Sequence, residues 1–141
     1  MKERRELVER RVDTKLVLVA AWVSLMLAYV YCDVFSFHRT GVISGILEGK
    51  IGPFEITQMS LFLFGLLMAI PSLMVLFTAC AKAGLGRAVN MVVSSLYFLV
   101  NIGHLIGETW AYYWLYGILE LGLVVFIFVT ALRWPRQAAK D

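Results

Sequence analysis

Six polar residues recur along one stretch of the chain at spacings typical of a helix face. Successive members lie 4, 3, 4, 3 and 4 residues apart, and they are Asn90, Ser94, Tyr97, Asn101, His104 and Glu108. In a helix, this heptad-like spacing places all six side chains on one face. An imidazole and a carboxyl group on that face could relay protons or bind a cation, and the amides and hydroxyls could equally do no more than bond neighbouring helices.

A second candidate for chemistry is Glu120, which lies in an almost uninterrupted apolar run, ILELGL at 118–123. A charged side chain at mid-bilayer costs roughly 2.5–3.5 kcal/mol on the insertion scale, so this acid needs a partner or a neutral form. Burial favours the protonated acid, whereas a cationic His104 beside it would favour the carboxylate. The sequence leaves both states open.

The other helices are expected to supply partners at matching depth. Asn101 and Glu120 each lie about ten residues from the turn near Trp110, or roughly 14 Å along a helix, and His104 lies about one turn closer to it. Tyr29 and Asp33 share a helix face at i,i+4, while Glu55 and Gln58 are expected to enter from the next span. The sequence therefore predicts a polar pocket in the outer half of a bundle, with these ligand-binding or proton-binding residues: Glu120, His104, Asp33, Asn101, Glu108 and Tyr29.

The composition shows what kind of protein must position these residues. Of 141 residues, 60% are hydrophobic and 16% are charged, with a mean hydropathy of +0.78. Soluble domains average about 25% charged residues. This balance indicates a membrane protein and excludes a nucleic-acid-binding domain, a disulfide scaffold and a disordered chain.

The apolar stretches predict an all-α fold, a four-helix transmembrane bundle. A spanning helix needs about 20 mostly apolar residues, and runs of this length without alternation are not barrel strands. The expected spans are 16–37, 56–80, 88–108 and 111–133. The long outer connection, 38–55, has apolar positions at Val42, Ile43, Ile46 and Leu47 that predict a short interfacial helix, either a cover for the bundle or a substrate gate.

The basic residues predict the orientation. Of the 13 lysines and arginines, only Arg39 and Lys50 would face outside if both termini lie in the cytoplasm. Short loops obey the positive-inside rule, so both termini are expected inside. The basic segment 1–15 would lie against anionic lipid headgroups, and 134–141 would form a cytoplasmic tail.

Pro71 interrupts the second span. A proline has no amide hydrogen, so the carbonyl of Leu67, four residues earlier, loses its usual helical partner. A kink is expected there, for packing or for function.

Three stretches resemble a known family: YCDVFSF at 31–37, FEITQMSLFLFGLLMAIPSLMVL at 54–76 and ILELGLVVFIFVTALRWP at 118–135. They are similar to an uncharacterised, domain-of-unknown-function family of small four-span prokaryotic membrane proteins. The residues within these stretches include Tyr31, Asp33, Gln58, Pro71, Glu120, Trp134 and Pro135. The resemblance implies a four-span protein of a prokaryotic plasma membrane and carries no activity with it.

Three functional classes remain open from the sequence. The first is a site that binds, and in a homodimer transports, a small cationic or protonatable ligand. The second is an accessory or assembly subunit of a larger membrane complex, with no nucleic-acid partner. The third is an enzyme acting on a lipid or quinone, for which no catalytic residue is assigned and no GxSxG or HExxH motif is present.

No cofactor or metal is expected from the sequence. A metal set of Asp33, Glu55, His104 and Glu108 has only one pair at helical spacing, and a haem between His38 and His104 would require His38 to lie inside the bundle.

Overall fold

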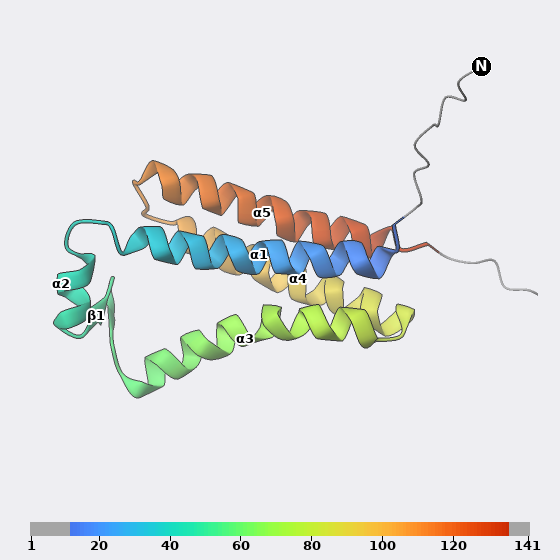
Figure 1. The fold of residues 1–141 in the computed structure, drawn as a ribbon, viewed down its shortest axis with the longest axis horizontal. Helices are drawn as coiled ribbons and strands as arrows, with labels where there is room; N and C mark the ends of the chain where they lie inside the picture. Colours follow the sequence, from blue (N-terminus) through green and yellow to red (C-terminus); the bar gives the residue numbers. More distant parts are fainter. Residues whose placement is uncertain (1–11, 136–141) are drawn as a thin grey trace, which may run out of the picture.

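The structure, a computed structural model, describes residues 12–135. Four of its helices are long and apolar enough to span a membrane: α1 (Thr14–Ser36), α3 (Gln58–Cys80), α4 (Ala83–Leu105) and α5 (Ala111–Leu132). They lie roughly side by side, as Figure 1 shows. The predicted all-α four-helix bundle is confirmed. Residues 1–11 of the expected basic segment 1–15 and residues 136–141 of the expected tail 134–141 lie outside the described residues.

The first two long helices begin at side-chain caps. Asp13 accepts a hydrogen bond from the amide of Lys15 at 2.7 Å. Thr57 and Ser60 form a reciprocal capping box at the start of α3. These caps satisfy amides that have no partner within the first helical turn.

The boundaries of α4 differ from those expected. It begins at Ala83 rather than at residue 88, so only residues 81–82 separate it from α3, and Gly84 and Gly86 are helical. It ends at Leu105, and the positive φ of Gly107 turns the chain toward α5. Glu108 therefore lies beyond the helix that was expected to carry it.

The packing is uneven around the bundle. The closest packing is between α4 and α5, followed by α1 against α5 and α1 against α3, whereas α3 packs much less closely against α4. We call the end where α1 begins and α5 ends the terminal end, and the opposite end the loop end. The part of the core toward the terminal end contains these side chains: Leu18, Trp22, Leu25, Met74, Val124 and Ile127.

One half of α3 leaves the bundle. The buried residues of this helix are Pro71, Met74 and Thr78, all in the half near the terminal end. In the other half, Met59, Phe62 and Leu66 are exposed, and Figure 1 shows this half diverging from α1 and α4. Pro71 is the first of the buried residues, and Figure 1 shows α3 bending between its two halves, as the proline leads one to expect.

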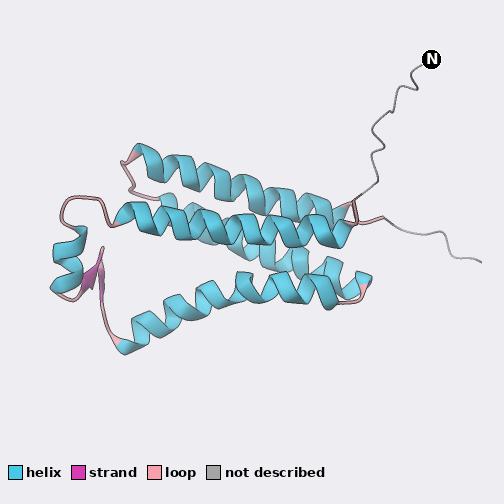
Figure 2. Ribbon diagram, viewed as in Figure 1, coloured by secondary structure: helices cyan, strands magenta, loops and turns pink. Residues whose placement is uncertain are grey.

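The connection between α1 and α3 covers the loop end. It holds the short helix α2 (Val42–Leu47) and a two-residue antiparallel ladder of β1 (Lys50–Ile51) and β2 (Phe54–Glu55), drawn in Figure 2. The helix was expected and the ladder was not. Ile43 and Leu47 on α2 are exposed, which suits a helix at the boundary of headgroups and acyl chains.

Candidate functional site

Three pairs of side chains, here called links, connect the first and third spans or the segments that follow them. Trp22 Nε1 donates to Asn90 Oδ1 at 2.7 Å, and the hydroxyl of Tyr29 donates to Asn101 Oδ1 at 2.8 Å. The third lies just beyond both helices at the loop end, where Arg39 bonds to Glu108. The polar face of α4 is therefore turned into the bundle, because Asn90, Ser94, Tyr97 and Asn101 are all buried.

The link nearest the terminal end is fully satisfied. Besides Trp22, Asn90 Oδ1 accepts from Thr78 at 3.2 Å, while Asn90 Nδ2 donates to Thr78 and to the carbonyl of Gly86. All of these groups are buried. This network joins three helices, and its hydrogen-bonding groups are already used within the protein rather than free to bind a ligand.

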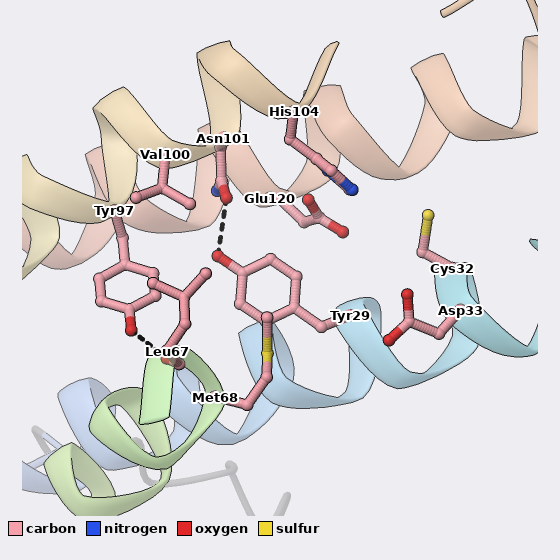
Figure 3. A pocket seen from close by; sticks show the side chains of 10 residues that line it. All are labelled: Tyr29, Cys32, Asp33, Leu67, Met68, Tyr97, Val100, Asn101, His104 and Glu120. Carbon is pink, nitrogen blue, oxygen red and sulfur yellow. Dashed lines mark hydrogen bonds between the residues drawn. The ribbon is translucent and has the colours of Figure 1, made fainter. Parts of the chain in front are cut away.

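A cavity of about 80 Å³ lies beside the bond between Tyr29 and Asn101 (Figure 3). A single water needs roughly 10–15 Å³ measured in this way, so several waters or a small ligand could enter. Its lining comes from all four long helices: Tyr29, Cys32, Asp33, Leu67, Met68, Tyr97, Val100, Asn101, His104 and Glu120.

Glu120 is the most unusual group in this cavity. Its side chain is 0% exposed, yet neither carboxyl oxygen has a hydrogen-bond partner within the described residues. Nδ2 of Asn101 is likewise buried and unpartnered in this part of the chain. An unsatisfied buried polar group costs about 1–3 kcal/mol, and more if it is charged, so these atoms call for a bound water or ligand.

The side of the cavity nearest the loop end is more open. Asp33 and His104 both line it and are both exposed, whereas Cys32, next to Asp33 on α1, is only 2% exposed. Figure 3 shows Cys32 and Asp33 directed from α1 toward the space that Glu120 and His104 face from α5 and α4. Nε2 of His104 is bonded to the hydroxyl of Tyr113 on α5.

The side of the cavity nearest the kink is formed by a bond to α3. The hydroxyl of Tyr97 donates to the carbonyl of Leu67, the group that Pro71 leaves without a helical partner. Tyr97 and Leu67 both line the cavity. The kink of α3 is thus held by the polar face of α4.

Glu108 takes part in a separate cluster at the loop end. Both of its carboxyl oxygens lie 3.1 Å from Arg39 Nη1, and the guanidinium lies 5.1 Å from the centre of the Trp110 ring. Burial alone would lower the pKa of Arg39, but the hydrogen bond and charge of Glu108 outweigh burial and raise it. The charge on Arg39 therefore persists, and Glu108 is neutralised at the surface.

The structure brings together five of the six residues expected at the site. Tyr29, Asp33, Asn101, His104 and Glu120 all line the cavity, and Glu108 does not. Glu55 and Gln58 also lie elsewhere, exposed where the chain enters α3, because the unpacked half of this helix carries them away.

Sequence reasoning missed several residues around the cavity. Tyr113, whose hydroxyl bonds to Nε2 of His104, was not among the expected site residues. The roles of Cys32, Met68 and Val100 had no signal in the sequence, because apolar lining residues resemble any core position.

The residues considered in the sequence for a metal or a haem are separated in the structure. Within residues 12–135, no group of three or more His, Cys, Asp or Glu side chains is placed to hold a metal ion. His38 lies exposed just beyond α1, where Nδ1 contacts the carbonyl of Val34 at 3.0 Å. It does not line the cavity with His104.

These observations define a class of protein: a membrane-spanning bundle of four helices with a polar cavity between them. The chain belongs to a family of unknown function, DUF6326, whose sequence model matches residues 5–140. Comparisons with curated proteins and with solved structures found no match.

Proposed function

We propose that this membrane protein binds a small cationic or protonatable ligand in the cavity beside Glu120. One observation carries the proposal: a fully buried carboxyl group lines a cavity and has no hydrogen-bond partner among the described residues. A buried acid that only served packing would be expected to bond to a neighbouring helix, as Asn90 does.

The chemistry of the lining favours a cation. Two acids, Glu120 and Asp33, face one imidazole, and the rings of Tyr29 and Tyr97 can stabilise a positive charge. With no cluster of three metal-ligating side chains in the described chain, an ammonium-type ion fits this lining better than a multivalent metal.

Binding is favoured over transport by a single chain. Beyond the cavity, the terminal-end half of the bundle is filled by Trp22, Leu25, Val124 and the Asn90 network. A continuous path would need this core to separate, or a second copy of the chain to provide one. We therefore place transport in a homodimer as the extension of a binding function.

We also propose that the loop end faces the outside of a prokaryotic plasma membrane. Lys15, Lys82, Arg87 and Arg133 lie near the terminal end, which by the positive-inside rule would face the cytoplasm. Ligand would then reach the cavity from the outer side.

Thermal unfolding in detergent tests the binding. Methylammonium chloride is compared with sodium chloride at equal ionic strength, in the unchanged protein, in Glu120→Gln and in Glu55→Gln. Glu55 is exposed and outside the cavity, so its variant is the matched control. At 100 times Kd, a ligand stabilises by about 2.7 kcal/mol.

We expect methylammonium to raise the unfolding temperature of the unchanged protein and of Glu55→Gln, and to leave folded Glu120→Gln unaffected. Equal responses from all three proteins would contradict the proposal. So would no response of the unchanged protein to methylammonium, ammonium or guanidinium.

An accessory role has one specific observation in its favour. The loop-end half of α3 exposes Met59, Phe62, Leu63 and Leu66 without packing on the bundle. Another polypeptide could pack there. A purified chain that is monodisperse and stable in detergent by itself would argue against this second candidate.

A further inference from the structure

We propose that the cavity opens sideways into the bilayer and that its ligand is an amphiphilic amine, with the ammonium group beside Glu120 and the apolar tail among lipid. This inference rests on the proposed function and names the class of ligand and its route. It follows from which sides of the cavity are closed and which one is not.

Helix α5 closes one side of the cavity. Tyr112 bonds to Ser36 on α1 at 3.0 Å, and Tyr113 bonds to His104 on α4. These two contacts join α5 to both neighbouring helices near the loop end. Glu120 lies on the same helix, two turns deeper, and is buried.

The Arg39 and Glu108 pair lies beyond the cavity, toward the loop end. Arg39 follows α1 and Glu108 follows α4, so the pair joins the same two elements that carry Asp33 and His104. Trp110 lies against the guanidinium. A ligand moving straight along the bundle axis from the loop end would have to part this charged cluster.

The side opposite α5 is the open one. Helix α3 contributes only Leu67 and Met68 to the lining and then leaves the bundle. Beyond that point Asp33 and His104 are exposed. We call the opening that we place among Asp33, Met68, Val100 and His104 the lateral window; Figure 3 labels these four lining residues.

The depth of the lateral window matches an amphiphile. Asp33 lies three residues before the end of α1 and Val100 five before the end of α4, or roughly 5–8 Å inside the helix ends. This is where a lipid changes from headgroup to acyl chain. Exposed Val30 and Leu66 provide apolar surface near the window.

The size of the cavity also favours an amphiphilic ligand. A volume of about 80 Å³ holds an amine headgroup but not a long alkyl chain. A tail must therefore remain outside, and in a membrane it gains about 0.8 kcal/mol for each buried CH₂. The polar lining then selects the head while the bilayer takes up the tail.

Cys32 provides a probe for this inference because its thiol lies inside the cavity. The test uses Cys80→Ser protein in liposomes, so that Cys32 is the only thiol. Modification by N-ethylmaleimide, which enters the bilayer, is followed by mass spectrometry and compared with a permanently charged thiosulfonate added to either side. Decylamine, methylammonium and decanol are the competing probes.

We expect N-ethylmaleimide to modify Cys32 faster, relative to free cysteine, than the charged reagent does. Decylamine should slow this modification and decanol should not. In Glu120→Gln, the decylamine concentration needed for the same protection should be about 10- to 100-fold higher. This is the effect of removing a hydrogen bond to a charged group. Glu55→Gln should keep it.

The possible failures are distinguishable. If methylammonium protects Cys32 through Glu120 but decylamine does not, the binding function stands and the lateral route is overturned. Faster modification by the charged reagent would also overturn the route. If neither amine protects Cys32, the proposed function fails together with this inference.

A pair of neighbouring residues checks the lateral window itself. Val100 lines the cavity, whereas Leu99 is 66% exposed on the outside of the same helix. We expect Val100→Phe to slow modification by N-ethylmaleimide and to weaken decylamine protection, with no change in Leu99→Phe. Unchanged rates in folded Val100→Phe would contradict entry at this position.

Discussion

The hydroxyl of Tyr97 on α4 donates a hydrogen bond to the carbonyl of Leu67 on α3. Pro71 leaves this carbonyl without its usual amide partner. One bond thereby couples the polar face of α4 to the point where α3 leaves the bundle. The kink therefore depends on a contact between two helices as well as on the proline itself. Stability and access to the cavity should both depend on it.

Tyr97→Phe is expected to destabilise the bundle. It leaves the Leu67 carbonyl unsatisfied in an apolar setting, and hydrogen bonds between membrane helices contribute about 0.6 kcal/mol on average and up to about 1.7. Unfolding equilibria in mixed micelles measure the loss. Tyr31→Phe is the control, because Tyr31 is 54% exposed, and an equal loss in both variants would contradict this role.

Pro71→Ala should reduce the cost of Tyr97→Phe. Alanine restores an amide that can donate to the Leu67 carbonyl, so the tyrosine bond becomes redundant. A double-mutant cycle is expected to give a coupling of about 0.5–3 kcal/mol between the two positions. Additive effects would mean that Tyr97 does not substitute for the missing amide.

Asn90→Ala should lower stability and leave ligand binding intact. It deprives Trp22 and Thr78 of a buried partner, each at a cost of about 1–3 kcal/mol. Ser95→Ala is a suitable control because Ser95 is exposed and bonds only to the carbonyl of Met91. Loss of the methylammonium response in folded Asn90→Ala would show that this network takes part in ligand binding, which would contradict its structural role.

Gly117 sets how closely α4 and α5 approach. A Cβ there would lie 2.8 Å from Cγ of the buried Leu105, so Gly117→Ala must displace that side chain. We expect a loss of about 1–3 kcal/mol in the free energy of unfolding. Gly122→Ala meets nothing within 4 Å and should be neutral or slightly stabilising. The reverse order would show that the helices do not pack as described.

Glu108→Gln should separate the surface pair from the cavity. Arg39 and Glu108 are 23% and 20% exposed, and partly solvated ion pairs contribute about 0.2–1 kcal/mol. The small loss should shrink further in high salt, since exposed charges are screened. Stabilisation by methylammonium should persist in this variant. Its loss would show that Glu108 takes part in binding the ligand.

The four spans and the polar face of α4 could be predicted from the sequence because both follow from local patterns. Apolar length determines the spans, and a repeat of three and four residues determines the face. The unpaired carbonyl of Leu67 was also predictable, since it follows from the covalent structure of Pro71. In each case the physical cause lies within one helix.

The partners across the bundle were harder to predict. Glu108 shares the spacing of the polar face, but the turn at Gly107 ends the helix before it and Arg39 neutralises it. Glu55 and Gln58 were at a plausible depth, yet the direction of the α3 kink carries them away. The sequence gives the depth of a residue along its helix but not the direction in which a kinked helix leaves its neighbours.

The central claim is that the Glu120 carboxyl receives the ligand, and infrared difference spectroscopy observes that group directly. Spectra of the protein in liposomes are recorded with and without methylammonium, and Glu120→Gln identifies the band of Glu120. We predict a change in carboxyl absorption on adding methylammonium that is lost in Glu120→Gln and kept in Glu55→Gln. A Glu120 band that does not respond to any amine would contradict the account.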